Sequence, residues 1–147
     1  MEDLEYSFRT PASAASLFDA VSTEAGHRAW WAMDCDVGAT VGAPCVMRFN
    51  KDGTLVTMKF RVDELVNNER VRWTCTDNDN PAWKGSTLTW HIESTGDERR
   101  LRLVHGGLAL GGPPYEMTKA GWRRFLDSLQ GYVEGRGGDP MPGMPAT

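Results

Sequence analysis

His105 is the residue whose type and position most readily suggest chemistry. Apolar and polar residues alternate up to this histidine, and the period of two places His105 on one face with Leu101 and Leu103. A histidine in an apolar pocket could anchor a ligand or act as a general acid or base with a lowered pKa. A hydrogen-bonded structural histidine beside Gly106 and Gly107 is the alternative. The pattern favours the structural role, then ligand contact, then catalysis.

The other histidines and the cysteines indicate no metal site. His27 is expected at a pocket rim or on the surface, and His91 on a solvent-facing side of a strand. Their spacing matches no metal-binding motif, and the three cysteines form no CxxC pair. Cys45 and Cys75 are expected to be inert buried thiols, whereas an exposed position stays open for Cys35.

No cofactor is expected. The sequence contains no GxSxG, P-loop or Rossmann fingerprint. The glycine-rich segment 106–114 follows no phosphate-loop template, and we expect it to form a mobile mouth between a strand and a helix.

Tryptophan is the most informative residue type in the chain. Each indole buries a large area and carries an N–H that needs a partner. Six of them in a small domain form either an aromatic core or the wall of a cavity. They are Trp30, Trp31, Trp73, Trp83, Trp90 and Trp122.

Periodicity predicts the elements that position these residues. Residues 4–10 alternate as a strand, and Thr10-Pro11 is expected to cap a short helix over 12–21, with Thr23 capping a second one that ends near Trp30. Five further alternating segments predict an antiparallel meander. They cover 45–50, 58–63, 71–76, 88–93 and 100–105.

A long helix follows the predicted sheet. Helical spacing predicts one helix over 115–134 with an apolar stripe. The stripe consists of Thr118, Trp122, Phe125, Leu129, Tyr132 and Val133. Gly121 beside the stripe is expected to permit close approach to the sheet. The domain should therefore span 1–138, and the Pro-rich segment 139–147 is expected to be a flexible or loosely docked tail.

Composition narrows the class of protein. The 147 residues fit one globular domain with 40% hydrophobic and 24% charged residues. A net charge of −4 argues against nucleic acid and anionic membranes as partners. The sequence shows no signal peptide and no apolar run long enough to span a membrane, so no membrane insertion is expected. The odd number of cysteines favours a cytoplasmic location.

Three stretches together carry a family resemblance. They run from Phe18 to Trp31, from Trp83 to Leu108 and from Gly121 to Gly135. In order and spacing the chain resembles the START-like helix-grip (SRPBCC) superfamily. More narrowly, it is similar to the family of the activator of heat-shock protein 90 ATPase.

The resemblance implies an α+β helix-grip fold. A curved antiparallel sheet would wrap around a long C-terminal helix, with a cavity between the sheet and this helix. Two short helices would follow the first strand. The superfamily includes lipid and hormone carriers, polyketide cyclases and co-chaperone domains, so fold alone does not select an activity.

Binding of a small hydrophobic or amphipathic molecule in an internal cavity is the leading functional hypothesis. A co-chaperone-like protein-interaction module, with a protein partner or a homodimer, is the alternative. A cyclase- or hydrolase-type enzyme using His105 with Tyr115 or Asp34 is the second alternative. Trp30, Trp31, Trp83, His105 and Tyr115 are expected at the open end of the cavity. The full set of candidate ligand-binding residues is Trp30, Trp31, Met58, Phe60, Trp73, Trp83, Trp90, His105, Tyr115 and Trp122.

Overall fold

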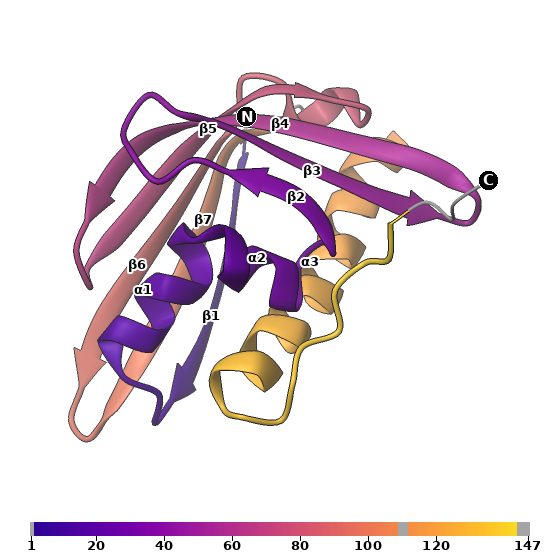
Figure 1. The fold of residues 1–147 in the computed structure, drawn as a ribbon. Coiled ribbons are helices and arrows are strands. Elements are labelled where there is room, and N and C mark those ends of the chain that lie inside the picture. The colour runs from indigo at the N-terminus through magenta and orange to yellow at the C-terminus, as the bar shows by residue number, and fades with distance from the viewer. Residues whose placement is uncertain (1, 109–111, 144–147) are drawn as a thin grey trace.

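One antiparallel sheet curves around the α-helices of the chain (Figure 1). The structure, a computed structural model, describes residues 2–108 and 112–143. The strands are β1 (Glu2–Thr10), β2 (Asp34–Val37), β3 (Pro44–Lys51), β4 (Thr54–Val66), β5 (Arg70–Asn78), β6 (Thr87–Thr95) and β7 (Glu98–Leu108). The helices are α1 (Ala14–Ser22), α2 (Glu24–Trp30) and α3 (Gly112–Val133), with a 3-10 turn η1 at Pro81–Trp83. The predicted α+β helix-grip architecture is confirmed.

The strand order confirms the predicted meander and has the predicted first strand at one edge and an additional strand at the other. The order is β1-β7-β6-β5-β4-β3-β2, so β3 to β7 follow one another as antiparallel neighbours. β1 pairs with β7, placing Leu4 opposite His105 and Tyr6 opposite Leu103. β2, which the periodicity analysis missed, pairs with β3 and sets Cys35 opposite Met47. Four residues are too few to reveal a period of two.

The two short helices begin at hydroxyl caps. Thr23 caps α2 as predicted, because its side chain accepts a hydrogen bond from the Gly26 amide. The predicted Thr10 cap is wrong. Ser13 caps α1 instead, accepting from the Ser16 amide, while the Thr10 hydroxyl accepts from Ala12. Both helices lie with α3 on the concave side of the sheet (Figure 1).

The long helix begins earlier than predicted. β7 continues to Leu108 and α3 starts at Gly112, so residues 109–111 of the expected mouth lie outside the described part of the chain. The predicted stripe is buried from Thr118 to Leu129, whereas Tyr132 at its end is exposed and Val133 is half-buried. Gly121 does not approach the sheet: a Cβ added there would meet only Phe125, at ordinary contact distance.

Part of the C-terminal tail is docked by backbone hydrogen bonds. The Met141 amide donates to the Trp31 carbonyl at 2.8 Å, and the Met33 amide donates to the Met141 carbonyl at 3.0 Å. The Asn50 amide in β3 donates to the Pro142 carbonyl at 2.7 Å. The segment therefore runs from α3 to the edge of the sheet (Figure 1). Residues 144–147 of the predicted flexible tail lie outside the described residues.

At Gly138, after α3, the chain is packed without space for a side chain. A Cβ at Gly138 would overlap the Ala29 carbonyl oxygen of α2. Next to it, the Asp139 amide donates to the Ser128 hydroxyl, which itself donates to the Trp30 carbonyl. Glycine at 138 thus lets the chain pass close to α2 and reach the sheet edge.

Candidate functional site

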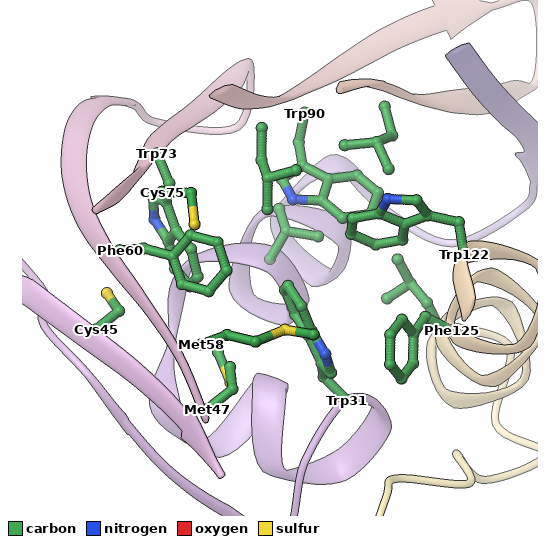
Figure 2. Close-up of a cluster of buried hydrophobic side chains, with 14 of the residues drawn as sticks. Trp31, Cys45, Met47, Met58, Phe60, Trp73, Cys75, Trp90, Trp122 and Phe125 are labelled. Carbon is green, nitrogen blue, oxygen red and sulfur yellow. The ribbon is translucent and has the colours of Figure 1, made fainter. Parts of the chain in front are cut away.

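An aromatic cluster fills the region between the sheet and α3 (Figure 2). All six tryptophans are buried, and none exposes more than 3% of its surface. Trp122 lies among them, with ring centroids 5.4 Å from Trp31, 5.6 Å from Trp83 and 6.1 Å from Trp90. The expected convergence of the strand and helix tryptophans on one interior is confirmed. Rings therefore occupy much of the space in which the sequence predicted a cavity.

His105 belongs to a hydrogen-bonded chain inside this cluster. Trp122 Nε1 donates to His105 Nδ1 at 2.9 Å, and His105 Nε2 lies 2.9 Å from the Ser86 hydroxyl. An indole N–H can only donate, so Nδ1 must accept and the neutral ring carries its proton on Nε2. Nε2 then donates to Ser86, which donates to the Trp83 carbonyl. The network uses both ring nitrogens of His105.

Burial keeps this histidine neutral. His105 is fully buried, and the loss of hydration lowers its pKa to about 3. A protonated ring would also turn an N–H towards the indole N–H of Trp122, and two donors cannot bond to each other. His105 is therefore a structural histidine in this geometry, in agreement with the role that the sequence favoured first.

A second polar group ties η1 to α3. The Trp83 indole donates to the Thr118 hydroxyl at 2.7 Å, and Asn80 Nδ2 donates to the same oxygen at 3.2 Å. Thr118 in turn donates to the Pro114 carbonyl at 3.0 Å. With two hydrogen bonds accepted and one donated, the hydroxyl has no bonding capacity left. Sequence periodicity placed Thr118 on the buried stripe without indicating this role.

His27 is buried, which corrects the expectation of a rim or surface position. Its ring stacks on Trp73 at 4.8 Å between centroids, and Nδ1 donates to the Thr23 carbonyl at 2.8 Å. Burial lowers the pKa of His27 to about 4. A single histidine in a seven-residue helix has no periodic context, so the sequence gave no indication of its orientation.

The cysteines are all buried, Cys35 included, although the sequence left an exposed position open for it. Burial raises the pKa of each thiol to about 11, so none is a reactive thiolate at neutral pH. Across residues 2–108 and 112–143, no cluster of histidine, cysteine, aspartate or glutamate could hold a metal ion. Nor is any helix of those ranges long and apolar enough to cross a membrane.

An open groove of about 870 Å³ lies beside the cluster, between the β3–β4 hairpin, η1, α3 and the docked tail. Its apolar lining comes from Phe49 and Met58 on the strands, Trp83 in η1 and Phe125 in α3. Met141 adds a wall from the tail. Four segments distant in sequence thus meet around one depression.

Charged side chains flank this apolar lining. Lys51 and Asp52 come from the hairpin, Asp79 precedes η1, and Arg124 projects from α3. Arg124 also forms an ion pair with Asp139 at 3.5 Å, which links the groove wall to the tail. Both signs of charge are therefore available to the polar part of a bound molecule.

The predicted site residues divide between the groove and the cluster behind it. Met58 and Trp83 line the groove. The other candidates are buried beside or behind it: Trp30, Trp31, Phe60, Trp73, Trp90, His105, Tyr115 and Trp122. The structure thus joins them into one core but brings only two of them to the groove. The sequence analysis missed Phe49 and Phe125 as lining residues, although alternation and helical spacing had shown that both face inward.

A family model described as Activator of Hsp90 ATPase homolog 1-like protein matches residues 11–134. The chain belongs to this family. The match begins before α1 and ends just after α3, so it includes the whole aromatic cluster and most of the groove lining. The family resemblance inferred from the sequence is therefore confirmed.

Solved structures show the same fold. The solution structure of the Aha1 dimer from Colwellia psychrerythraea is 24% identical, with a TM-score of 0.78, over 92% of this chain and 98% of that one. Protein CV1439 from Chromobacterium violaceum is 23% identical, with a TM-score of 0.76, over 90% and 96% of the two chains. The protein DynU16 from the dynemicin biosynthetic locus is 21% identical, with a TM-score of 0.70, over 91% of this chain and 48% of its own. Comparison with the curated proteins found no match.

Proposed function

We propose that the chain binds a small amphipathic molecule in the groove between the β3–β4 hairpin, η1 and α3. The observation that carries this proposal is the groove itself. Its volume of about 870 Å³ falls within the range of small-molecule sites, about 300–1,000 Å³. Phe49, Met58, Trp83 and Phe125 offer an apolar floor, so burial of an apolar body would drive binding.

The charges at the groove favour an amphipathic ligand over a purely apolar one. Lys51 has no ion-pair partner among the described residues, whereas Arg124 already pairs with Asp139. An anionic or strongly polar head group could therefore interact with Lys51 while the body lies on the floor. Because Lys51 is at the open side, this contact would add specificity more than affinity.

Family membership supports binding in this region without selecting the ligand. START-like proteins include carriers and cyclases that use the space between sheet and long helix. In this chain aromatic rings take up much of that space, and the groove opens beside them. Met58 and Trp83 are the proposed contact residues. The other eight candidates are buried in the cluster and do not line the groove.

Enzymatic catalysis receives less support from the geometry. His105 is sealed in the core with both nitrogens engaged, and Asp34 points elsewhere, paired with Arg48 at 3.0 Å. An active site needs titratable groups that converge on a reacting atom. The predicted combination of His105 and Asp34 does not meet in this structure.

A protein partner or a second copy of the chain is the second candidate occupant. Met117 of α3 lines the groove, and 50% of its surface is exposed. Leu55 lies in strand β4 of the hairpin, and 45% of its surface is exposed. Exposed apolar side chains near a groove are typical of interaction surfaces. Light scattering of the purified protein, with and without a groove-binding probe, would show dimers that the probe dissociates.

A cytoplasmic location stays a prediction, and the free buried thiols are compatible with it.

The groove can be tested by filling it. Ala120 is exposed and lines the groove, whereas Glu116 is exposed one turn earlier and does not. We expect Ala120→Trp to weaken binding of 1-anilinonaphthalene-8-sulfonate by about tenfold or more, which is about 1.4 kcal/mol. Glu116→Trp should change the affinity by less than about twofold. Isothermal titration calorimetry on both variants decides. Equal affinities would place the probe elsewhere and contradict the proposal.

A further inference from the structure

Trp31 carries a buried hydrogen-bond donor that the protein leaves unused. Its side chain is fully buried, yet its Nε1 has no hydrogen-bond partner among the described residues. Trp30, Trp83 and Trp122 are different, because each of their indole N–H groups donates to a carbonyl, a hydroxyl or an imidazole. A buried donor without an acceptor is costly, so an unpaired one calls for an explanation.

The Trp31 ring packs against Phe125, a residue that lines the groove. Figure 2 shows the Trp31 ring between Met58 and Phe125, with its nitrogen on the side of Phe125. The centroids of the Trp31 and Phe125 rings are 5.4 Å apart. Both Met58 and Phe125 line the groove, and the Trp31 carbonyl accepts from Met141, which lines it too. The Trp31 ring is therefore next to Phe125 and Met58 of the groove lining, and its backbone is bonded to Met141.

We propose that Trp31 Nε1 is the specificity-determining donor of the groove, and that it selects ligands whose apolar body carries a hydrogen-bond acceptor such as a ketone, ester or amide carbonyl. This inference rests on the proposed function, because it takes the groove as the binding site. The acceptor enters between Met58 and Phe125. An unbranched methionine adapts to such an insertion with little strain.

The chemistry of the donor defines the class of ligand. An indole N–H donates and cannot accept, so it distinguishes a carbonyl from a methylene group of the same size. On binding, the ligand's acceptor loses its hydrogen bond to water and gains one from a buried donor. That donor has no competing partner among the described residues. Charge at the inserted end is disfavoured, because Phe49, Met58, Trp83 and Phe125 offer it no counter-charge. The inserted acceptor is therefore neutral, and any charged group of the ligand stays at the rim.

Trp73 supplies a matched control. Its Nε1 is also buried and without a described partner, but Figure 2 shows Trp73 on the opposite side of the cluster from Phe125, against Phe60. It does not line the groove. Trp31→Phe and Trp73→Phe therefore remove equivalent unpaired donors from the same core, and only the first removes one from a ring that packs against the groove lining.

The experiment uses two probes that differ in one group. 2-Acetylnaphthalene carries a carbonyl where 2-ethylnaphthalene has a methylene. We titrate each into ¹⁵N-labelled protein and follow the six indole N–H signals, with Trp31→Phe assigning the Trp31 signal. We expect only the ketone to move this signal to lower field. Trp31→Phe should weaken ketone binding about 2- to 10-fold, the range for one neutral hydrogen bond, and leave the hydrocarbon within about twofold. Trp73→Phe should leave both affinities within the same limit.

The outcomes separate this inference from the proposed function. If both probes bind in the groove and the Trp31 signal moves with neither, the ring face of Phe125 already accepts the N–H and the donor role is wrong, while the groove stands. If neither probe binds, the groove proposal and the donor role both fail. If Trp31→Phe does not fold, through-bond NMR experiments assign the Trp31 signal in the unmodified protein, and its titration still decides between these cases.

Discussion

Two regions that share helix α3 differ in whether their buried polar atoms have hydrogen-bond partners. Around Trp122, a series of hydrogen bonds runs from its indole through His105 and Ser86 to the Trp83 carbonyl, and each donor has an acceptor. Towards the groove, the Trp31 indole is buried without a partner and Lys51 stands without a counter-ion among the described residues. A saturated network stabilises one arrangement of the core, whereas unused bonding capacity beside a depression favours an incoming molecule.

The largest expected effect tests the saturated region. Trp122→Ala should lower the free energy of unfolding by about 3–5 kcal/mol, because it removes a fully buried indole and leaves His105 Nδ1 without its donor. Chemical denaturation measures the difference. Arg123→Ala, next to it but exposed, should stay within about 0.5 kcal/mol. A loss below about 1 kcal/mol for Trp122→Ala would show that the network contributes little to stability.

Acidification should weaken the same region. The His105 pKa is about 3 in the folded chain and about 6.5 when unfolded, so between these values the unfolded chain binds the extra proton. Its stabilising contribution is complete above pH 6.5 and is lost as the pH falls towards 3. From pH 7 to pH 5 the loss is about 2 kcal/mol for one such group.

A variant that cannot titrate isolates this contribution. Glutamine at position 105 can still accept from Trp122 and donate to Ser86, so His105→Gln should flatten the pH dependence of stability between pH 7 and 5. Denaturant midpoints across this range give the slope. His91→Gln, at a partly exposed strand position, should change the slope much less. Unchanged slopes in both variants would argue that His27 or other groups dominate acid unfolding.

The smallest expected effect concerns the groove region. Gly138→Ala would push the tail away from Ala29 and release the wall that Met141 contributes, at a cost of about 1–2 kcal/mol in the free energy of unfolding. Gly143→Ala, where a Cβ would make an ordinary contact with Asp34, should be nearly neutral. Thermal melts and probe titrations on both variants compare tail docking with groove binding. Identical behaviour would mean that the tail is not part of the groove wall in solution.

Local patterns predicted the sheet and long helix well, because burial imposes a period on each strand and on α3. Alternation placed Trp73 and Trp90 on the concave face, and helical spacing placed Trp122 opposite them. Alternation predicts on which face of the sheet a side chain lies, but not how far that side chain is from the groove. Of the residues expected at the open end, which were Trp30, Trp31, Trp83, His105 and Tyr115, only Trp83 lines the groove.

The groove depends on contacts that no local pattern encodes. Phe49, Thr118 and Met141 come from a hairpin, a helix and a tail far apart in the chain. Composition predicted a flexible or loosely docked tail but no particular contact, and three backbone hydrogen bonds dock it at Met141 and Pro142. Backbone pairing is nearly independent of side-chain type, so composition is a poor guide to it.

The pairing of β1 with β7 has a consequence for the order of folding. Leu4 lies opposite His105, so β1 obtains its neighbour only after the strands and helices between β1 and β7 have been made. Closing so long a loop costs entropy before the contact is gained, and topologies dominated by such contacts fold slowly. The β3–β7 meander, built from neighbouring hairpins, can form first. Until β1 returns, the outer edge of β7 stays unpaired, and a nascent chain at this stage is exposed to edge-to-edge aggregation.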